Sequence, residues 1–497
     1  MPVIDCHVHP QAVENYKNAA EKLLKHMRMH GIEQMILSDL GDKWLAYPDS
    51  ATLQRANERL QKVCADSNGT MHYLVYLNPQ LADWHDELAR HCRSACGVKL
   101  WISLKDPADG SLKRSIEVLN ASVQLDLPVL IHTFERTDGV VGGAVGIDGI
   151  IELARAVPEC QIIAAHACGS WRRAIKRAGE FPENIVFDIS GSYPERTMVK
   201  RLYEAFGAKR LLYGSDAYGR SFGSQKHKVF EAKLPEEDNH AILYANACRI
   251  FKLQPLQGSV KIDLPRRVMA DLSEDHFCFA GISPWFDHRV TAACLAENAE
   301  KCGVKQAFAA SLEAACSAEF ASVNIRWLNE CSAYKVIKPL AAVDLRDLPQ
   351  AFQQLKYMVG FAGIWISPYL HGYDISDAVF RAFFEQCSID KVLIWINMTL
   401  SDDRFRCRDL KTRECQLSEL TAFAQDAPQN HYVVQGAVQH GQVLEQLPEN
   451  FALEYSRLSD GEYLAENFQG DISRLRRGSE YPFRSYDAVD NVLLGIL

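Results

Sequence analysis

The sequence predicts an α/β protein that consists of two tandem (β/α)8 barrels, of which the second is degenerate. Three observations predict this fold class. The 497 residues exceed what one hydrophobic core normally organises and suit two domains of about 250 residues each. The first half alternates short apolar segments with longer amphipathic ones, and the second half repeats several motifs of the first. We therefore expect a first barrel over 1–255, a linker over 256–270 and a second barrel over 271–497.

Eight apolar segments of the first half have the length and composition of buried strands. The intervening segments are able to form helices, as in 19–31, where Leu23, Leu24 and Met27 recur near helical spacing before Gly31. Eight buried strands that alternate with helices are typical of a parallel barrel, whose chemistry lies at the carboxyl ends of the strands. The predicted strands are VIDCH (3–7), EQMILSDL (33–40), MHYLVYLNP (71–79), GVKLWIS (97–103), LPVLIHTF (127–134), QIIAAHA (161–167), NIVFDISG (184–191) and KRLLYGSD (209–216).

Histidine and aspartate residues gather at the ends of these predicted strands. His7 and His9 lie two apart at the end of the first strand, so both imidazoles point to the same side. A single strand-end histidine or aspartate often only caps a turn, but a set that converges on one rim is hard to explain by capping. The later strands add His132 on the fifth, His166 on the sixth, Asp188 late in the seventh and Asp216 on the eighth.

Such a set of side chains has the chemistry of a metal site. Neutral imidazoles and a carboxylate suit Zn, Mn or Fe, and three or four ligands leave a position open for water. A bound divalent ion lowers the pKa of that water to near 7, while a spare histidine or aspartate moves protons. We expect one divalent metal ion, with Zn first and Mn or Fe as alternatives.

Composition excludes several classes of partner. The net charge is −9 and the basic residues are scattered, so a nucleic acid partner is not expected. No stretch reaches 18 consecutive apolar residues, and Asp5 interrupts the apolar core that a signal peptide would need. The fifteen cysteines are spread singly, as in a reduced protein. We expect a cytoplasmic protein that has a small-molecule substrate and no membrane partner.

The motifs along these strands carry a family resemblance. DCHVHP (5–10), LIHTF (130–134), AHACGS (165–170) and LLYGSDA (211–217) together resemble the amidohydrolase superfamily. The similarity is to the branch of small metal-dependent hydrolases and decarboxylases that includes aminocarboxymuconate semialdehyde decarboxylase. The segment ILYANACRIFKL (242–253) is similar to the closing helix of that branch. The resemblance spans residues 1 to about 253 and lies in the order and spacing of the motifs.

The resemblance implies roles for individual residues. His7, His9 and His132 are similar to the metal ligands, and Asp216 to an aspartate that contacts the metal and takes a proton from the attacking water. His166 is similar to a histidine that acts as acid or base in members with one metal and ligates a second metal in others.

Lys99 raises the question of a second ion. Relatives with two metals use a carboxylated lysine near the end of the fourth strand, whereas Lys99 should lie one layer deeper, with Trp101 nearer the rim. We expect one metal and a Lys99 amine that pairs with a carboxylate, because an unpaired interior charge is costly. Lys99 and His166 are the candidate ligands of a possible second ion.

The loops after the strands should carry the substrate contacts, since barrels vary their chemistry through loops. The candidate contacts are Trp101, Arg172, Tyr218 and Arg220.

The second half repeats the pattern without the ligands. CGVKQAFAASL (302–312) echoes HGIEQMILSDL (30–40), and NFALEYS (450–456) echoes NIVFDIS (184–190). We predict a barrel that has lost catalysis and pairs with the first as an intramolecular pseudo-dimer, further oligomerisation being left open. The competing hypothesis is a new pocket at Trp395 and the following loop. In a hand alignment Phe279 replaces His7, Gly281 replaces His9, Trp395 replaces His132, Gly436 replaces His166 and Glu480 replaces Asp216.

Three functions fit these residues. The first is a metal-dependent hydrolase in which metal-activated water attacks an amide, lactone or ester, with Asp216 and His166 as catalytic residues. The alternative is a non-oxidative decarboxylase of a small aromatic or unsaturated carboxylic acid. The third is a binding or scaffold protein descended from such an enzyme.

Overall fold

The chain divides into two compact units, residues 1–264 and 265–497, each of which is described by itself. The division falls inside the segment 256–270. None of the described helices is long and apolar enough to cross a membrane. The computed structural model describes residues 1–10, 16–41, 46–104, 110–136, 139, 141, 143–191, 197–217, 222–256, 275–283, 286–301, 303–400, 412–426, 428–437, 446–454 and 472–481.

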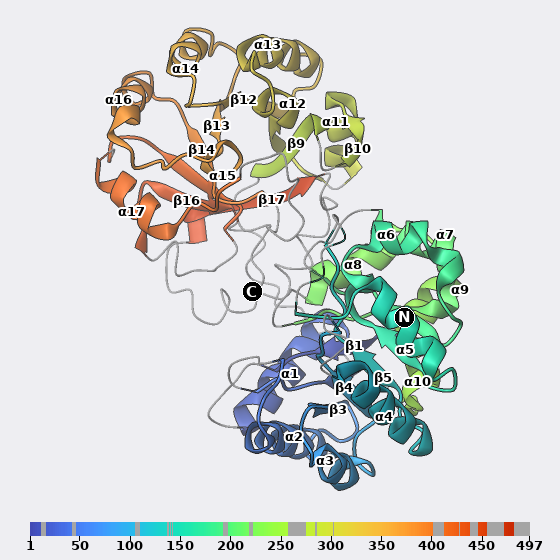
Figure 1. Ribbon diagram of the computed structural model, residues 1–497. Helices are drawn as coiled ribbons and strands as arrows, with labels where there is room; N and C mark the ends of the chain where they lie inside the picture. Colours follow the sequence, from blue (N-terminus) through green and yellow to red (C-terminus); the bar gives the residue numbers. More distant parts are fainter. Residues whose placement is uncertain are drawn as a thin grey trace. The chain divides into compact units, whose positions relative to one another are not determined.

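The first unit contains eight parallel strands that follow one another in chain order (Figure 1). The ring closes where the Cys6 N–H donates to the Tyr213 carbonyl, 3.0 Å away, and where Val8 forms a parallel bridge with Ala217. All eight lie at the predicted positions, and nearly every strand residue is buried, which explains their apolar composition. The strands are β1 (Ile4–Val8), β2 (Gln34–Leu37), β3 (Met71–Leu77), β4 (Gly97–Leu100), β5 (Val129–Ile131), β6 (Ile162–Ala164), β7 (Ile185–Asp188) and β8 (Leu211–Leu212).

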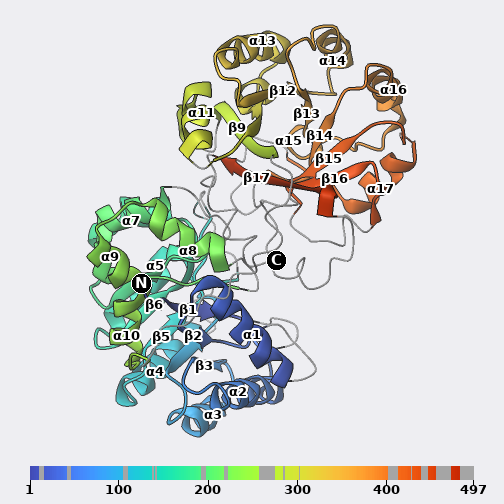
Figure 2. The ribbon, with the colours of Figure 1, turned by 180° about the vertical axis from the view of Figure 1, so that it is seen from behind.

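Helices surround these strands, as the view from behind also shows (Figure 2). The Asp49 side chain caps α2 by accepting the Thr52 N–H at 2.7 Å. The helices are α1 (Tyr16–His30), α2 (Ser50–Ala65), α3 (Trp84–His91), α4 (Ser111–Gln124), α5 (Ile147–Ala156), α6 (Trp171–Lys176), α7 (Met198–Phe206), α8 (Phe222–Glu231), α9 (Glu236–His240), the π-helix η5 (Ala241–Ala245) and α10 (Asn246–Phe251).

The amino-terminal end of the first barrel is filled by η5 and α10. Asn246 fixes α10, because its Nδ2 donates to the carbonyls of Ala208 and Leu211 at 2.8 Å each. Polar chemistry is therefore left to the carboxyl ends of the strands. The apolar cluster at the filled end joins Ile4, Leu74, Leu130, Ile163 and Leu212 of the strands with Tyr244, Ile250, Phe251 and Leu253.

The second unit also alternates strands and helices around a curled sheet. Its β17 pairs with both β16 and β9, so eight parallel strands form a ring, and β10 adds an antiparallel edge that the sequence did not predict. The strands are β9 (Asp275–Ser283), β10 (Phe286–Val290), β11 (Gln306–Ser311), β12 (Ile337–Val343), β13 (Gly363–Ile366), β14 (Ile394–Asn397), β15 (Tyr432–Gln435), β16 (Phe451–Glu454) and β17 (Leu475–Tyr481). The helices are α11 (Ala292–Lys301), α12 (Leu312–Ala315), α13 (Phe320–Cys331), α14 (Leu348–Leu355), α15 (Pro368–His371), α16 (Arg381–Ile389) and α17 (Leu417–Asp426).

Aromatic side chains fill the interior of the second unit. Phe277 stacks on Trp395 with ring centroids 5.0 Å apart, and Phe279 meets Trp365 at 5.7 Å. Among the described residues, groups suited to hold a metal occur in the first unit alone. The loss of catalysis in the second unit stays a prediction, since the Glu480 side chain lies outside the described residues.

Two side-chain bonding patterns recur in both units. Arg210 Nε donates to the Ile185 carbonyl at 2.9 Å, and Arg474 Nε donates to the Phe451 carbonyl at 2.8 Å. Each arginine also donates through Nη2 to the carbonyl three residues before that acceptor. A barrel does not require such bonds, so their repetition supports the predicted duplication, which itself stays a prediction.

The second recurring pattern is an asparagine on a helix that bonds both backbone groups of one strand residue. Asn57 of α2 bonds the N–H and carbonyl of Tyr76, and Asn324 of α13 bonds those of Ala342. The predicted duplication would also explain why this asparagine pattern occurs in both units.

Candidate metal centre

A bulge in β1 aims two histidines at the barrel interior. The pairing of β1 with β2 shifts register between Asp5 and Val8. The Asp5 carboxylate stabilises the bulge by accepting the N–H groups of His7 and Ser215 at 3.2 and 2.9 Å. Bulges commonly re-aim side chains beside active sites. His7 and His9 are consequently both buried on the inner side of the strand.

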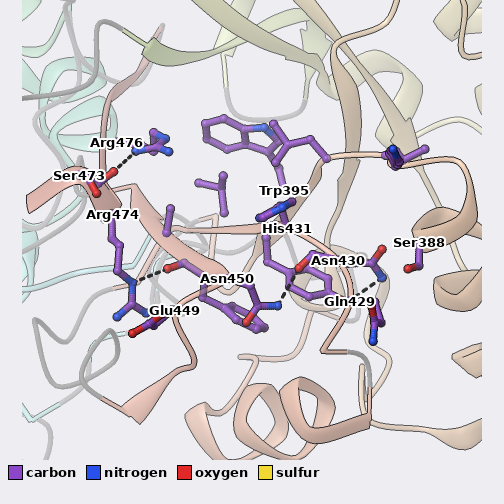
Figure 3. A pocket seen from close by; sticks show the side chains of 17 residues that line it. Ser388, Trp395, Gln429, Asn430, His431, Glu449, Asn450, Ser473, Arg474 and Arg476 are labelled. Carbon is purple, nitrogen blue, oxygen red and sulfur yellow. Dashed lines mark hydrogen bonds between the residues drawn. The ribbon is translucent and has the colours of Figure 1, made fainter. Parts of the chain in front are cut away.

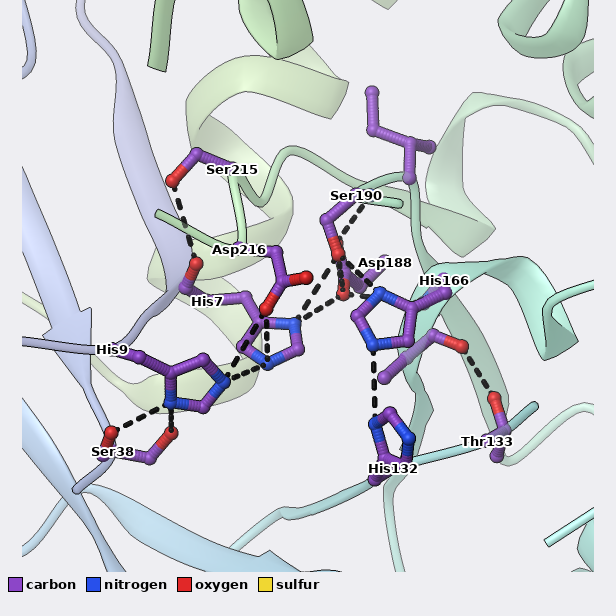
Figure 4. A network of polar contacts seen from close by, with 12 residues as sticks. His7, His9, Ser38, His132, Thr133, His166, Asp188, Ser190, Ser215 and Asp216 are labelled. Atoms are coloured by element: carbon purple, nitrogen blue, oxygen red, sulfur yellow. Dashed lines mark hydrogen bonds and ion pairs between the residues drawn. The ribbon is translucent and has the colours of Figure 1, made fainter. Parts of the chain in front are cut away.

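Three side chains converge at this point, as Figure 4 shows. The Nε2 atoms of His7 and His9 are 3.1 Å apart, and Asp216 Oδ1 lies 3.8 and 3.4 Å from them. The three ligand atoms lie within 4.8 Å of one another. Their donor set of two imidazole nitrogens and a carboxylate oxygen is one that Zn, Mn or Fe accepts.

The hydrogen bonds on the other ring nitrogens leave these Nε2 atoms unprotonated. His7 Nδ1 donates to Asp188 Oδ2 at 2.7 Å, and His9 Nδ1 donates to the Ser38 carbonyl at 2.7 Å. A carboxylate or carbonyl behind the ring is the usual arrangement for metal-bound histidines. Burial also lowers the pKa of His9, which keeps that imidazole neutral. The residues therefore fit a divalent ion.

His132 and His166 form a second pair in the same barrel. His166 Nδ1 donates to Ser190 Oγ at 2.9 Å, and the His132 Nδ1–H donates to His166 Nε2 at 3.2 Å. This arrangement leaves His132 Nε2 unprotonated. Burial lowers the pKa of His132 far below its usual value and that of His166 to about 3. His132 does not belong to the group of three ligand atoms above, whereas His166 forms a second group with His7 and Asp188.

The backbone is strained beside these ligands. His166, Ala167 and Cys168 all have positive φ values, of 58°, 45° and 67°, and Asp216 has 60°. Such conformations cost about 1–3 kcal/mol each and persist where the surroundings enforce them. Here the Glu135 N–H donates to the Cys168 carbonyl at 2.9 Å and the Asp216 N–H to the His7 carbonyl at 2.7 Å. The sequence motifs gave no sign of this strain.

Lys99 reaches the same centre. It is 1% exposed, and its Nζ lies 2.9 Å from His7 Nε2. The long Lys99 side chain extends along the interior to the His7 imidazole, and the Asp216 and Asp188 carboxylates favour its charged form. The expectation that Lys99 pairs with a carboxylate stays a prediction. Burial lowers the pKa of Lys99 to about 8.

Asp188 and Ser190 connect the two histidine pairs. Asp188 Oδ2 accepts the Ser190 hydroxyl at 2.6 Å as well as His7 Nδ1, and is completely buried. Burial opposes ionisation, but His7, His166 and Ser190 hold the pKa of Asp188 well below its usual value. Sequence alone indicated Asp188 without a firm role and did not indicate Ser190. Ser190 could have been found, because it lies two residues after an aspartate at the end of a strand.

Replacing Ser190 with alanine should lower kcat about tenfold while the metal content stays near one per chain. The hydroxyl that accepts from His166 Nδ1 is lost, so the imidazole can adopt the wrong tautomer, whereas the ligands of the ion keep their other partners. The measurement is the pH profile of kcat with metal analysis of the same sample. Ser367→Ala, in the second unit, should change neither value; equal losses in both variants would contradict the assignment.

The structure describes two of the four candidate substrate contacts, Trp101 and Arg172. Trp101 is held at the site, since its ring centroid lies 4.9 Å from that of His132 and its Nε1 donates to the Gly143 carbonyl at 3.0 Å. Arg172 lies over the Trp171 ring at 4.4 Å. Tyr218 and Arg220 lie outside the described residues.

The sequence model of the amidohydrolase family, Amidohydro_2, matches residues 4–253, which is half of the chain. The chain belongs to the amidohydrolase family. This confirms the resemblance drawn from the motifs, and the matched residues include every member of the candidate metal site. No curated protein sequence shows significant similarity to this amidohydrolase-family chain.

Several solved structures are similar to about half of this chain. They include 2,6-dihydroxybenzoate decarboxylase from Rhizobium, with 20% identity over 51% of this chain and 99% of that chain and a TM-score of 0.42. A dihydroxybenzoic acid decarboxylase from Polaromonas sp. JS666 with bound manganese and 2-nitroresorcinol has 19% identity over 52% and 98%, with a TM-score of 0.43. 4-Oxalomesaconate hydratase from Rhodopseudomonas palustris has 16% identity over 50% and 95%, with a TM-score of 0.40.

Proposed function

We propose that the first unit is a metal-dependent enzyme that removes carbon dioxide from a small aromatic or unsaturated carboxylic acid without oxidation. His7, His9 and Asp216 would hold one divalent ion, with His132 as the fourth ligand. A bound ion of this kind supplies a Lewis acid for carboxylate or carbonyl oxygens. Zn, Mn and Fe all suit these ligands.

The buried Lys99 is the observation that carries this proposal. The carboxylates of Asp188 and Asp216 balance the charge of a divalent ion, and burial keeps the imidazoles of His9 and His166 neutral. The Lys99 ammonium is a further cation beside this centre, with its Nζ 2.9 Å from His7 Nε2. A substrate carboxylate would pair with this cation and a neutral amide or ester would not, so a carboxylate substrate is favoured.

The chain's own residues would handle the proton that the reaction needs. Cleavage of the bond to the carboxylate releases carbon dioxide and leaves the electron pair on carbon, which then takes a proton. The Asp216 side chain is 17% exposed and that of Asp188 is 0% exposed. Asp216 is therefore placed to pass a proton between solvent and substrate, and Asp188 to fix the orientation of His7.

Hydrolysis is the second candidate function, and the position of Lys99 again supports it. If the Lys99 amine carried a carbamate, the charge at this position would be negative instead of positive. The carbamate would then help to hold a second ion together with His166. Two ions would favour attack of water on an ester, lactone or amide carbonyl.

A labelled-substrate assay separates the two reactions. The metal-loaded chain is incubated with a panel of carboxyl-¹³C hydroxybenzoates and unsaturated acids, and in parallel with aryl esters and lactones. We expect ¹³CO2 from at least one acid, lost in Asp216→Asn. Hydrolysis of the esters without carbon dioxide release from any acid would overturn the proposal.

Lys99→Met tests the charge argument. We expect about one metal ion per chain to remain, while affinity for a carboxylate inhibitor falls about 10- to 100-fold, because a charge-assisted partner is lost. Inhibitor titration and metal analysis give both values. Lys226→Met, at another lysine of this unit, should behave as the parent. A fall from two ions to one would instead show that Lys99 carried the carbamate of a hydrolase.

A further inference from the structure

The second unit has a cavity at the amino ends of four strands, β14 to β17, with a volume of about 1080 Å³. In the first unit the same end of the barrel is covered by the closing segment 241–253, which includes η5 and α10. In the second unit the described residues end with β17, and residues 482–497 lie outside them. The loop after Trp395, where the sequence also allowed a pocket, leaves β14 at the other end, and its residues 401–411 are not described either.

The strand residues that line the cavity match those that the closing segment covers in the first unit. In β5 to β8 the second residue of each strand belongs to the apolar cluster that contains Tyr244, Ile250 and Phe251 of the closing segment. In β14 to β17 the second residue of each strand lines the cavity. Three of these four cavity residues are apolar, so the surface suits an apolar segment. The matched pairs are Leu130 with Trp395, Ile163 with Val433, Val186 with Ala452 and Leu212 with Arg476.

One polar contact of the closing segment is reversed in sign in the second unit. Lys252, which follows α10, donates through Nζ to the Asp126 carbonyl at 2.9 Å and pairs with the Asp126 carboxylate. Lys391 stands at the matching position, since it precedes the first residue of β14 by as many residues as Asp126 precedes that of β5. Asp126 and Lys391 also share a left-handed backbone, with φ of 58° and 53°. A segment that closes the second barrel should therefore carry an acid where Lys252 stands in the first.

The remaining charges around the cavity also favour an acidic segment. His431, Arg474 and Arg476 line it together with Lys391, and Glu449 is the one acid among the described lining residues (Figure 3). Exposed ion pairs contribute little to stability, so these charges select the segment and its orientation, whereas apolar contact supplies most of the affinity.

Residues 486–497, YDAVDNVLLGIL, have the composition that such a segment needs. Asp487 and Asp490 supply acids for the cavity cations. The segment also has apolar residues at the spacing of one helical face, which are Val489, Val492, Leu493 and Ile496.

The chain between β17 and this segment is long enough to return to the amino ends of the strands. From Leu475 to Tyr481 β17 rises about 20 Å, at about 3.3 Å per residue. A fully extended chain with the length of 482–488 spans about 23 Å. Residues 489–497 can therefore reach the cavity of their own unit.

We propose that residues 486–497 bind in this cavity and close the second barrel. Asp487 or Asp490 lies against Lys391, and the apolar face of the segment packs on Trp395 and Val433. The inference concerns the second unit alone, so it does not depend on the metal centre or on the reaction proposed for the first.

Carbodiimide cross-linking tests this contact in the full metal-loaded chain. The reagent joins an amine to a carboxylate that touches it, and peptide mass spectrometry locates the new bond. We expect Lys391 to be joined to Asp487 or Asp490. Lys356, an exposed lysine outside the cavity, should be joined to neither. In a mixture of ¹⁴N- and ¹⁵N-labelled chains, the linked peptides should carry a single isotope, because both ends belong to one chain.

Charge reversal makes the test specific. Lys391→Asp should abolish this cross-link, and its combination with Asp487→Lys and Asp490→Lys should restore a bond between the same positions with the amine and the carboxylate exchanged. Failure of the reversed pair to cross-link would contradict the pairing.

Hydrogen exchange gives a second readout on the parent chain and on a chain that ends at residue 485. Removal of 486–497 should raise amide exchange in 391–394 and 430–433 about tenfold or more, because their cover is lost, and should leave α14 unchanged. Unchanged exchange in the two segments, linked peptides of mixed isotope that reveal a second copy, or equal cross-linking of Lys391 and Lys356 would overturn the proposal.

Discussion

Replacing His7 and His9 together with alanine should reduce the bound metal from about one ion per chain to none. The two Nε2 atoms, 3.1 Å apart, supply half of a four-ligand set, and Asp216 with His132 cannot hold an ion at useful affinity alone. Activity should fall at least about a thousandfold, since Lewis-acid stabilisation is worth several kcal/mol. Plasma mass spectrometry of protein purified without a chelating tag measures the first effect, and the product assay measures the second.

A matched control separates metal loss from unfolding. Phe279→Leu changes the second-unit position aligned with His7 and should leave metal content and activity unchanged. Circular dichroism should show both proteins folded. One ion retained by the double variant would mean that other residues bind the metal. No ion in the parent after reconstitution with Zn, Mn or Fe would contradict the metal centre itself.

Asp188→Asn should weaken metal binding about 10- to 100-fold. The carboxylate accepts the His7 Nδ1 proton at 2.7 Å and the Ser190 hydroxyl at 2.6 Å. An amide can turn its NH2 group toward His7, which favours the tautomer that carries the proton on Nε2 and so blocks the ligand atom. Competition with a chelator of known affinity gives the metal dissociation constant.

Glu454→Gln is the control for this change, because the alignment places Glu454 opposite Asp188 and both side chains are completely buried. We expect unchanged metal affinity in that variant, whatever its thermal stability. Equal weakening in the two variants would show a general stability effect and would contradict the role of Asp188 behind His7.

The two units have different interiors within the same kind of scaffold. Where the first unit has His7 and Lys99 at the centre, the second has Phe279 and Trp365 in ring contact at 5.7 Å. The repeated bonds of Arg210 and Arg474 concern backbone carbonyls, which do not depend on the interior side chains. A barrel can thus keep its framework while its interior changes from a polar site to an aromatic core.

Much of the first unit could be read from the order of residues. Periodicity and strand-end position are local properties, so the eight strands and the histidines on them followed from sequence, and the family match over 4–253 confirmed the resemblance. Sequence also indicated a second set of strands, although it missed the antiparallel β10. Sequence placed hydrolysis before decarboxylation by a small margin only, because both reactions use the same ligands.

Only the tertiary structure decided how these residues act on one another. The register shift in β1, the Asp188 carboxylate behind His7 across 181 residues of sequence, and the approach of Lys99 Nζ to His7 all depend on the closure of the ring. Ring closure sets side-chain distances that no local pattern contains. Sequence by itself therefore determined the histidines and aspartates at the strand ends. Packing decided that Lys99 and Ser190 join them, and it set the partners of each side chain.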